Sequence, residues 1–187
     1  MTLHLIQPRQ LYGPAERQAE LQKAWDINDT IFDAVTSIEG QPTFAEMFAL
    51  CRRGCVNVIA NSDIYFDDTL RKHAIRLEAD QCWALSRWDD LGGENIYPYH
   101  RPDSQDAWII RGGPHYVTAP YAMGVPGCDN AIAYELNAMG WEVINPCQTV
   151  RAIHLHKSGY RTYGGGRGKP KAYSVPPPYL KVVPCSL

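Results

Sequence analysis

The sequence predicts a single α/β domain in which helices cover a mainly parallel twisted sheet. Its 187 residues and 21.0 kDa fit one domain of ordinary size. Short apolar runs with strand character alternate along the chain with stretches of helical periodicity, and no internal repeat interrupts the alternation. Strands that alternate with helices are typical of parallel sheets, which bind ligands at the carboxyl ends of their strands.

The first third of the chain supplies three predicted strands. Residues 3–6 form a short apolar strand, and Pro14 suits the first turn of a polar helix that continues to about residue 28. We expect a second strand at 31–38 and, after Pro42, a helix at 43–53 with apolar residues at helical spacing. The third strand, 56–60, has a buried β pattern and ends abruptly in the polar run 61–68.

The rest of the chain repeats the alternation with longer loops. Asp68 is predicted to cap a helix at 69–79, and a strand at 82–86 follows. Residues 91–104 and 111–127 are predicted loops, rich in Gly and Pro, on either side of a strand at 108–110. A helix that runs to Met139 is expected to have Asp129 as its cap and Gly140 as its stop. Strands at 142–144 and 149–155 complete the domain.

The predicted domain covers residues 1–163, and 164–187 form a basic tail rich in Gly and Pro. Such a tail cannot form regular core, so we expect it to lie on or over the domain. From residue 149 to the end there is no Asp or Glu, while seven residues are basic. This charge suits a polyanion such as a diphosphate, and equally a solvated basic tail. The basic residues are Arg151, Lys157, Arg161, Arg167, Lys169, Lys171 and Lys181.

Composition argues against several classes of protein. No apolar run approaches the roughly 20 residues that span a bilayer, and residues 1–10 are too polar for a signal peptide, so we expect a cytoplasmic protein. The six cysteines match neither a zinc framework nor a compact disulfide scaffold, and we expect buried or tolerated thiols. A net charge of −2 does not predict electrostatic binding of nucleic acid.

The polar run after the third strand is the first candidate site. Asn61, Ser62 and Asp63 stand where an α/β domain binds a cation or a phosphate. A carboxylate there suits Mg²⁺ or Mn²⁺ bridging two phosphates. The alternative is a turn in which Asp63 and Asp67 accept hydrogen bonds from backbone donors.

Two later motifs carry further candidates. The loop 124–130 brings Asp129 to the start of a helix, where its carboxylate can accept a proton from an attacking hydroxyl or only cap the helix. In His154-Leu155-His156, alternation along a strand places both imidazoles on one face. They can bind a metal, or they are ordinary polar surface.

The order of these motifs resembles the GT-A class of glycosyltransferases, in particular the compact glycosyltransferase-like proteins of microbes and large viruses. The resemblance covers about residues 31–163. It implies a single-domain GT-A fold, a nucleotide-diphosphate sugar as donor, Mn²⁺ or Mg²⁺ as cofactor, and a glycan or small hydroxyl acceptor. The motifs that carry it are IANSDI at 59–64, ALSRWD at 84–89, SQDAW at 104–108 and GCDNAIAYEL at 127–136.

The resemblance also implies roles for individual residues. Asp63 would hold the cation, with His154 or His156 completing the metal shell, and Asp129 would be the general base of an inverting transfer. A retaining reaction follows if Asp129 only caps the helix or anchors the acceptor. Asn61 departs from the family pattern, which has an acid at the first position of an Asp-x-Asp motif, and would contact the ribose or a metal-bound water instead.

Further residues are assigned to the substrates. Arg87 can pair with phosphate and Trp88 can support a sugar ring, or they are a surface Arg beside a core Trp. In the last segment the glycines would let a lid close over the diphosphate. The predicted donor-binding residues are Asn61, Ser62, Asp63, Arg87 and Trp88; the acceptor-binding residues are Asp106, Trp108 and Asn130; the lid residues are Lys157, Arg161 and Tyr163.

Other functions remain open from the sequence. A nucleotidyltransferase ranks lower because the chain has no Gly-rich phosphate loop with a Lys. A hydrolase is not expected, because the chain has no Gly-x-Ser-x-Gly elbow. A nucleotide-sugar-binding module that has lost catalysis fits the Asn at position 61. A glycosyltransferase that modifies hydroxylated bases of DNA fits the basic tail. The loops 91–104 and 111–126 would set the identity of sugar, nucleotide and acceptor.

Overall fold

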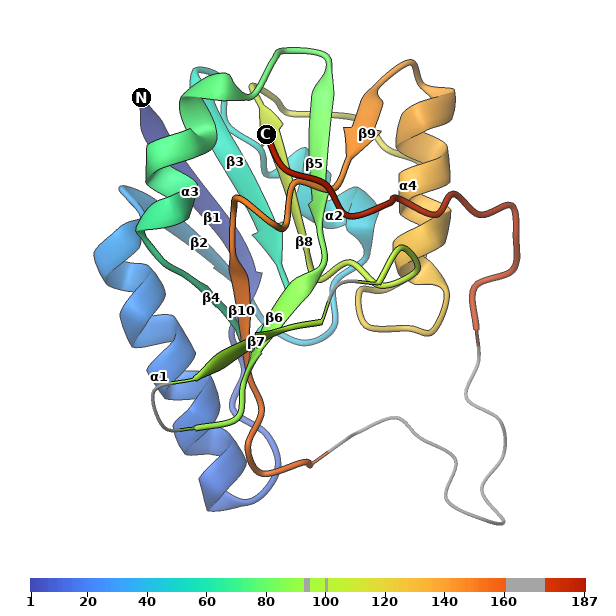
Figure 1. Cartoon of the computed structure of the whole chain (residues 1–187). Helices are drawn as coiled ribbons and strands as arrows, with labels where there is room; N and C mark the ends of the chain where they lie inside the picture. The colour runs from blue at the N-terminus through green and yellow to red at the C-terminus, as the bar shows by residue number, and fades with distance from the viewer. Residues whose placement is uncertain (93–94, 100, 161–173) are drawn as a thin grey trace.

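The computed structural model describes residues 1–92, 95–99, 101–160 and 174–187, and a six-stranded sheet forms its centre (Figure 1). β1 is parallel to β2 and β3, and β5 is parallel to β9, whereas β8 runs antiparallel between β3 and β5. The sheet is therefore mixed and mostly parallel, compatible with a Rossmann-like fold, and the expected α/β class is confirmed. In spatial order the strands are β2 (Ala34–Ile38), β1 (Thr2–Pro8), β3 (Cys55–Ala60), β8 (Ala107–Arg111), β5 (Gln81–Leu85) and β9 (Glu142–Ile144).

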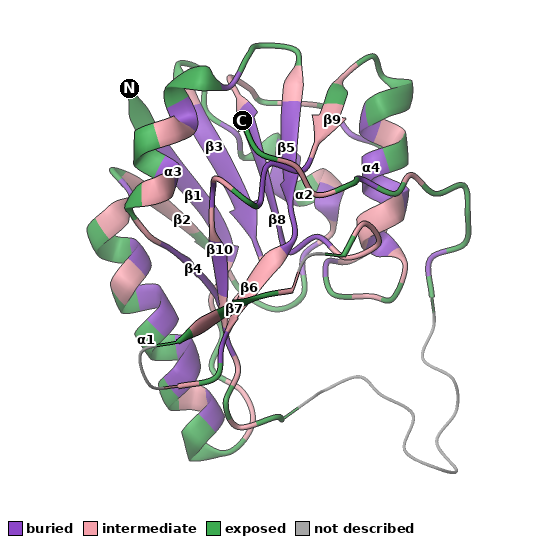
Figure 2. Ribbon diagram, viewed as in Figure 1, coloured by how far each residue is buried: buried purple, intermediate pink, exposed green. Residues whose placement is uncertain are grey.

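Side chains of the central strands alternate between two apolar cores, one on each face. Figure 2 shows most of the central strands in the purple of buried residues. In β1, Leu3 and Leu5 face one core and Ile6 faces the other. α2 (Phe44–Ala49) and α4 (Cys128–Ala138) cover the face of Ile6, and α3 (Asp68–His73) with the 3₁₀ turn Ala74–Arg76 covers the opposite face. This burial on both faces explains the nearly continuous apolar sequence of β3 and β8.

A second sheet lies at the carboxyl ends of β3 and β5. β4 directly follows β3 and β6 directly follows β5, so both strands cross from the central sheet into the smaller one. α1 (Ala15–Ile31) packs against β4 and β10 through Ala24, Tyr65 and Leu155. The order of its strands is β4 (Ile64–Phe66), β10 (Ala152–Leu155), β6 (Arg87–Asp90) and β7 (Ile96–Pro98).

Several element boundaries differ from the prediction. β4 lies in the polar run 61–68 and β7 lies in the predicted loop 91–104, and neither strand was expected. β6 continues directly from the predicted strand 82–86. β4 and β6 pair with β10, which comes from much later in the chain, and β7 pairs with β6. Residues expected to begin the second strand instead end α1 at Ile31. Asp67, not Asp68, caps α3: its Oδ1 accepts a hydrogen bond of 3.0 Å from the backbone N–H of Thr69.

The start of α4 corrects a second predicted cap. Gly127, at φ 85°, precedes the helix and no side chain caps it. Asp129 lies within the first turn, where a carboxylate still interacts favourably with the helix dipole. The predicted stop is confirmed: Gly140 has φ 95°, and the N–H of Trp141 donates to the carbonyl of Leu136 at 3.1 Å.

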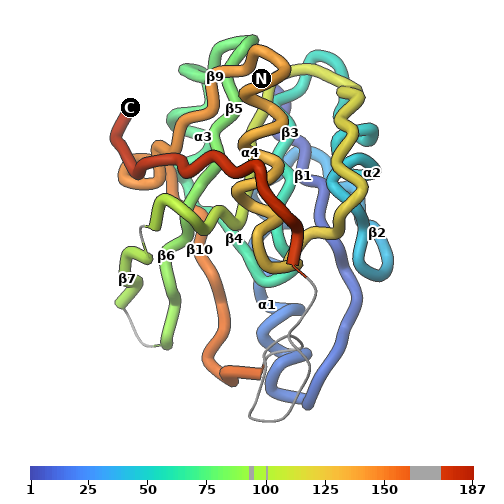
Figure 3. The backbone as a smooth tube through the Cα atoms, turned by 90° about the vertical axis from the view of Figure 1, so that its right-hand side faces the viewer, coloured from blue at the N-terminus to red at the C-terminus, as the bar shows by residue number. Residues whose placement is uncertain are grey.

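The described part of the C-terminal tail packs on the domain and crosses α4 (Figure 3). Val175 and Val182 are buried, and the N–H of Leu180 donates to the carbonyl of Asn130 at 2.9 Å. All six cysteines are free thiols, as expected. Among the described residues, no helix has the length and apolar character to cross a bilayer.

Candidate functional site

A pocket of about 390 Å³ opens where the carboxyl ends of β1 and β3 meet the second sheet. Its polar lining includes the turn after β3, the strand β6, the end of β10 and the residue His156 beyond it, the segment before β8, and residues in and before the first turn of α1. The pocket brings together seven of the residues singled out in the sequence. They are Asn61, Ser62, Asp63, Arg87, Asp106, His154 and His156.

One carboxylate oxygen is the centre of this cluster. Asp63 Oδ2 lies 3.1 Å from His154 Nε2 and 3.7 Å from His156 Nδ1. His154 and Asp63 come together because the backbone N–H of Leu155 donates to the carbonyl of Asp63 at 3.0 Å, which aligns the end of β10 with the turn after β3. The two imidazoles that strand alternation was expected to place on one face both lie close to Asp63.

Charge and burial fix the protonation of these groups. Burial raises the pKa of Asp63, but His154, His156 and Arg17 outweigh it and hold that pKa well below the ordinary value. Burial lowers the pKa of His154, but the carboxylates of Asp63 and Asp89 raise it to about 9. His154 Nδ1 is 3.1 Å from Asp89 Oδ1, so a carboxylate orients the ring nitrogen that faces away from Asp63.

The cluster has the donor set of a divalent metal site. The ligand atoms of Asp63, His154 and His156 all lie within 4.8 Å of one another. Two ligands about 2.1 Å from one ion are separated by roughly 3.0 Å at right angles and by more at wider angles, which matches the observed 3.1 and 3.7 Å. A carboxylate that orients a ligating His is also usual in metal sites. The Nε2 atom of His156 is buried and has no hydrogen-bond partner among the described residues.

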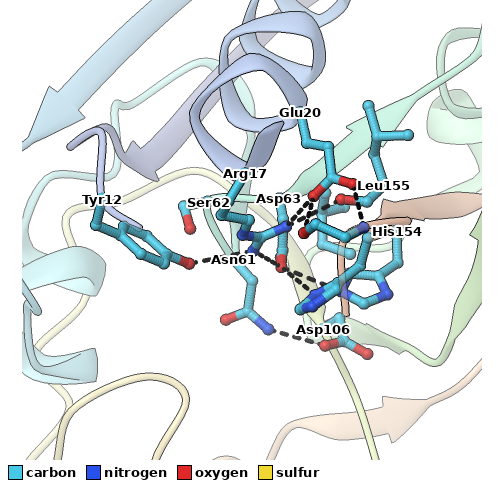
Figure 4. A network of polar contacts seen from close by, with 12 residues as sticks. Tyr12, Arg17, Glu20, Asn61, Ser62, Asp63, Asp106, His154 and Leu155 are labelled. Carbon is cyan, nitrogen blue, oxygen red and sulfur yellow. Dashed lines mark hydrogen bonds and ion pairs between the residues drawn. The ribbon is translucent and has the colours of Figure 1, made fainter. Parts of the chain in front are cut away.

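Arg17 of α1 closes the cluster from the other side (Figure 4). Its Nη2 lies 2.5 Å from Asp63 Oδ2 and 3.1 Å from the hydroxyl of Tyr12. Its Nη1 donates to the carbonyl of Leu155 and to Glu20 Oε2, at 3.1 and 3.2 Å. The side chain is only 1% exposed, so its charge is held in place by these partners.

Asn61, Asp106 and Arg87 form a second polar group in the pocket. Asn61 Nδ2 donates to Asp106 Oδ1 at 2.8 Å, and Arg87 Nη1 lies 3.4 Å from Asp106 Oδ2. Arg87 Nε also donates to Asp89 Oδ1 at 2.8 Å. Asn61 therefore has a partner other than the metal cluster, and Arg87 links that cluster to Asp106.

Asp129 lies behind Asp106 and is not among the residues that line the pocket. Its carboxylate accepts hydrogen bonds from the backbone N–H of Gln105 and from the Cys128 thiol. Burial and, next, the charge of Asp106 raise the pKa of Asp129 to about 7. A carboxylate with this pKa can exchange a proton near neutral pH.

Comparison of the chain with protein-family models, with curated proteins and with solved structures finds no match.

Four residues predicted to bind substrate lie elsewhere. Trp108 is fully buried and packs edge-on against Phe44 with ring centroids 4.7 Å apart, so it cannot contact an acceptor. Trp88 does not line the pocket, and its Nε1 donates to the carbonyl of Cys147. Asn130 donates to the carbonyl of Asp103 beneath the C-terminal segment.

Lys157, the fourth, lies beside Gly92 and not in the pocket. The other two predicted lid residues, Arg161 and Tyr163, lie outside the described residues.

The prediction missed two charged residues of the site, Arg17 and Asp89. The sequence pattern of α1 does indicate a buried position for Arg17. Arg17 recurs at helical spacing with the apolar residues of the helix, so it lies on the face that packs against the domain. The buried residues of α1 are Arg17, Glu20, Leu21, Ala24, Trp25 and Asn28.

Proposed function

We propose that the protein is a metal-dependent glycosyltransferase that moves a sugar from a nucleotide-diphosphate donor to a hydroxyl acceptor. One observation carries the proposal: a carboxylate and two imidazoles suited to a divalent ion share a pocket with two guanidinium groups, those of Arg17 and Arg87. A diphosphate needs this combination, because both metal ions and arginines bind phosphate oxygens.

The pocket lining suits the two parts of such a donor. Tyr12, Gln10 and Gln41 are among the lining residues, and an aromatic ring and two amides can pack against and hydrogen-bond a nucleobase. Arg87 and Asp106 also line the pocket and can contact the diphosphate and the sugar. An ion bound by Asp63, His154 and His156 would neutralise the charge that develops on the departing diphosphate.

Transfer then needs one proton acceptor. The acceptor oxygen forms a bond to the anomeric carbon while the bond from that carbon to the diphosphate oxygen breaks, and the hydroxyl proton goes to a carboxylate. We assign this role to Asp129, because its pKa of about 7 suits a general base. Asp129 does not line the pocket, so this role requires the acceptor hydroxyl to reach its carboxylate beyond the pocket wall, past Asp106. Attack from the side opposite the diphosphate inverts the anomeric configuration.

Release of the nucleoside diphosphate tests the proposal directly. The purified protein is incubated with UDP-, GDP-, CDP- and dTDP-sugars, with a panel of glycan and small hydroxyl acceptors, and with Mn²⁺ or EDTA. We expect one nucleoside diphosphate to be released with Mn²⁺ present and not with EDTA. Release that does not change when Asp63→Ala replaces the wild type would contradict the proposed metal site.

A second function is favoured by the contact between Asn61 and Asp106. In this pair the amide of Asn61 stands where the resemblance leads one to expect an acid, and it is bonded to Asp106. A binding module for nucleotide sugars that has lost catalysis fits this arrangement. Metal-dependent nucleotide binding without release of nucleoside diphosphate from any donor and acceptor pair would favour the binding module.

A further inference from the structure

Arg17 and the proposed metal ion would share one oxygen atom. Asp63 Oδ2 is 2.5 Å from Arg17 Nη2, 3.1 Å from His154 Nε2 and 3.7 Å from His156 Nδ1. A cation bound between Asp63 and the two imidazoles would therefore lie close to a guanidinium that cannot lose its charge. This inference rests on the proposed function, because it concerns the metal site of that proposal.

The surroundings of Arg17 leave it little freedom to withdraw. Tyr12, Glu20 and the carbonyl of Leu155 all accept hydrogen bonds from its guanidinium, and the side chain is 1% exposed. Glu20 pairs with Nη1, and hydrogen bonds from the N–H and the hydroxyl of Ser158, at 2.6 and 2.8 Å, hold it there, so that Nη2 remains directed at Asp63. Charges this close interact strongly where water is excluded.

We propose that Arg17 is the permanent cation of the site: with His154 it neutralises Asp63 when no metal is bound, and, because its charge stays in place, it makes a divalent ion bind weakly unless a diphosphate binds with it. The diphosphate brings the negative charge that offsets the repulsion between the two cations. Arg17 also lines the pocket, so the same guanidinium faces the space that the diphosphate would occupy. Metal and nucleotide should then bind together rather than independently.

The test measures the affinity for Mn²⁺ alone, by calorimetry or by the electron paramagnetic resonance of free Mn²⁺. We expect Arg17→Met to bind Mn²⁺ at least about tenfold more tightly than the wild type, because a nearby positive charge is removed. Arg17→Lys keeps the charge and should stay close to the wild type. Arg71→Met is the matched control, because it removes a cation from an exposed pair with Asp33 that lies outside the pocket.

A second variant covers the case in which Arg17→Met does not fold. The double variant Arg17→Gln with Glu20→Gln removes the two buried charges as a pair. It should bind Mn²⁺ at least about tenfold more tightly than the single variant Glu20→Gln. If these variants bind Mn²⁺ no more tightly than their references, the role of Arg17 is overturned. The metal site still stands in that case if the wild type binds Mn²⁺ and Asp63→Ala does not. Absence of Mn²⁺ binding in every variant, with or without UDP or GDP, would overturn both.

Discussion

Asn61 Nδ2 donates a hydrogen bond of 2.8 Å to Asp106 Oδ1 at the edge of the pocket. This contact gives a structural reason for the amide that stands where the resemblance leads one to expect an acid. A carboxylate at position 61 would face the carboxylate of Asp106 at the same distance, with only the opposite oxygen of Asp106 paired to Arg87. The hydrogen bond to Asp106 is therefore a reason for an amide at position 61 that does not involve a metal.

Asn61→Asp should destabilise the fold without strengthening metal binding. Two carboxylates in contact repel each other, so the loss of unfolding free energy should be larger at pH 7.5 than at pH 5, where one of them can take up a proton. Denaturant unfolding at the two pH values measures the difference, with Asn61→Ser as the uncharged control. A variant as stable as the wild type at pH 7.5, with tighter Mn²⁺ binding, would show that the amide weakens a metal site of the usual kind.

Asp129 should leave a pH signature in stability. Its pKa is about 7 in the folded chain against an ordinary value of 3.8, so the folded state holds the proton more tightly than the unfolded state. The stability that this proton contributes is complete below about pH 4 and is lost as the pH rises through about 7. In denaturant unfolding between pH 4 and 8, the wild type should lose stability relative to Asp129→Asn. Parallel curves would show that Asp129 has an ordinary pKa.

Arg87 should contribute to stability as well as to the pocket. It pairs with Asp89 at 2.8 Å and Asp106 at 3.4 Å, and its side chain is 16% exposed. Arg87→Met removes the guanidinium partner of two poorly hydrated carboxylates, which keep only His154 and Asn61 as partners, and should cost about 3 kcal/mol of unfolding free energy. Arg101→Met is the comparison, because Arg101 pairs with Asp103 and is 54% exposed, and its loss should leave stability close to the wild type. Equal effects would mean that burial of the Arg87 pairs has no consequence.

Trp108 should behave as a core residue. Truncation by Trp108→Ala should cost about 3–5 kcal/mol of unfolding free energy because it leaves a cavity against Phe44. Trp108→Phe keeps most of the packing and should leave nucleotide affinity and turnover near the wild type. A folded Trp108→Phe variant that has lost acceptor use specifically would restore the acceptor role expected from sequence.

The central strands could be predicted because their own apolar sequences indicate buried β-strands. β3 and β8 are nearly all apolar, and both are buried on two faces. β4 and β6 could not be predicted, because their pairing with β10 depends on residues far away in the sequence. The location of Asp63 could also be predicted, because polar residues that directly follow a buried strand lie at the carboxyl edge of the sheet.

The site could be predicted only in part, for the same reason. His154 and His156 follow from a motif, but the contact of Asp63 with Arg17 joins residues 46 positions apart on different elements. Trp108 shows the opposite error. A Trp beside polar residues is compatible with a binding role, and only the packing of α2 against β8 reveals that it is buried.

The most direct test of the central claim is a calorimetric titration with UDP, GDP, CDP and dTDP, with and without Mn²⁺, on the wild type and on Asp63→Ala. Asp29→Ala is the matched control, because Asp29 is a 52% exposed carboxylate paired with Arg9 outside the pocket. We predict that one nucleoside diphosphate binds, that Mn²⁺ tightens its binding, and that the tightening is lost in Asp63→Ala but kept in Asp29→Ala. Failure of all four nucleotides to bind the wild type would contradict the assignment of this pocket to a nucleotide-sugar donor.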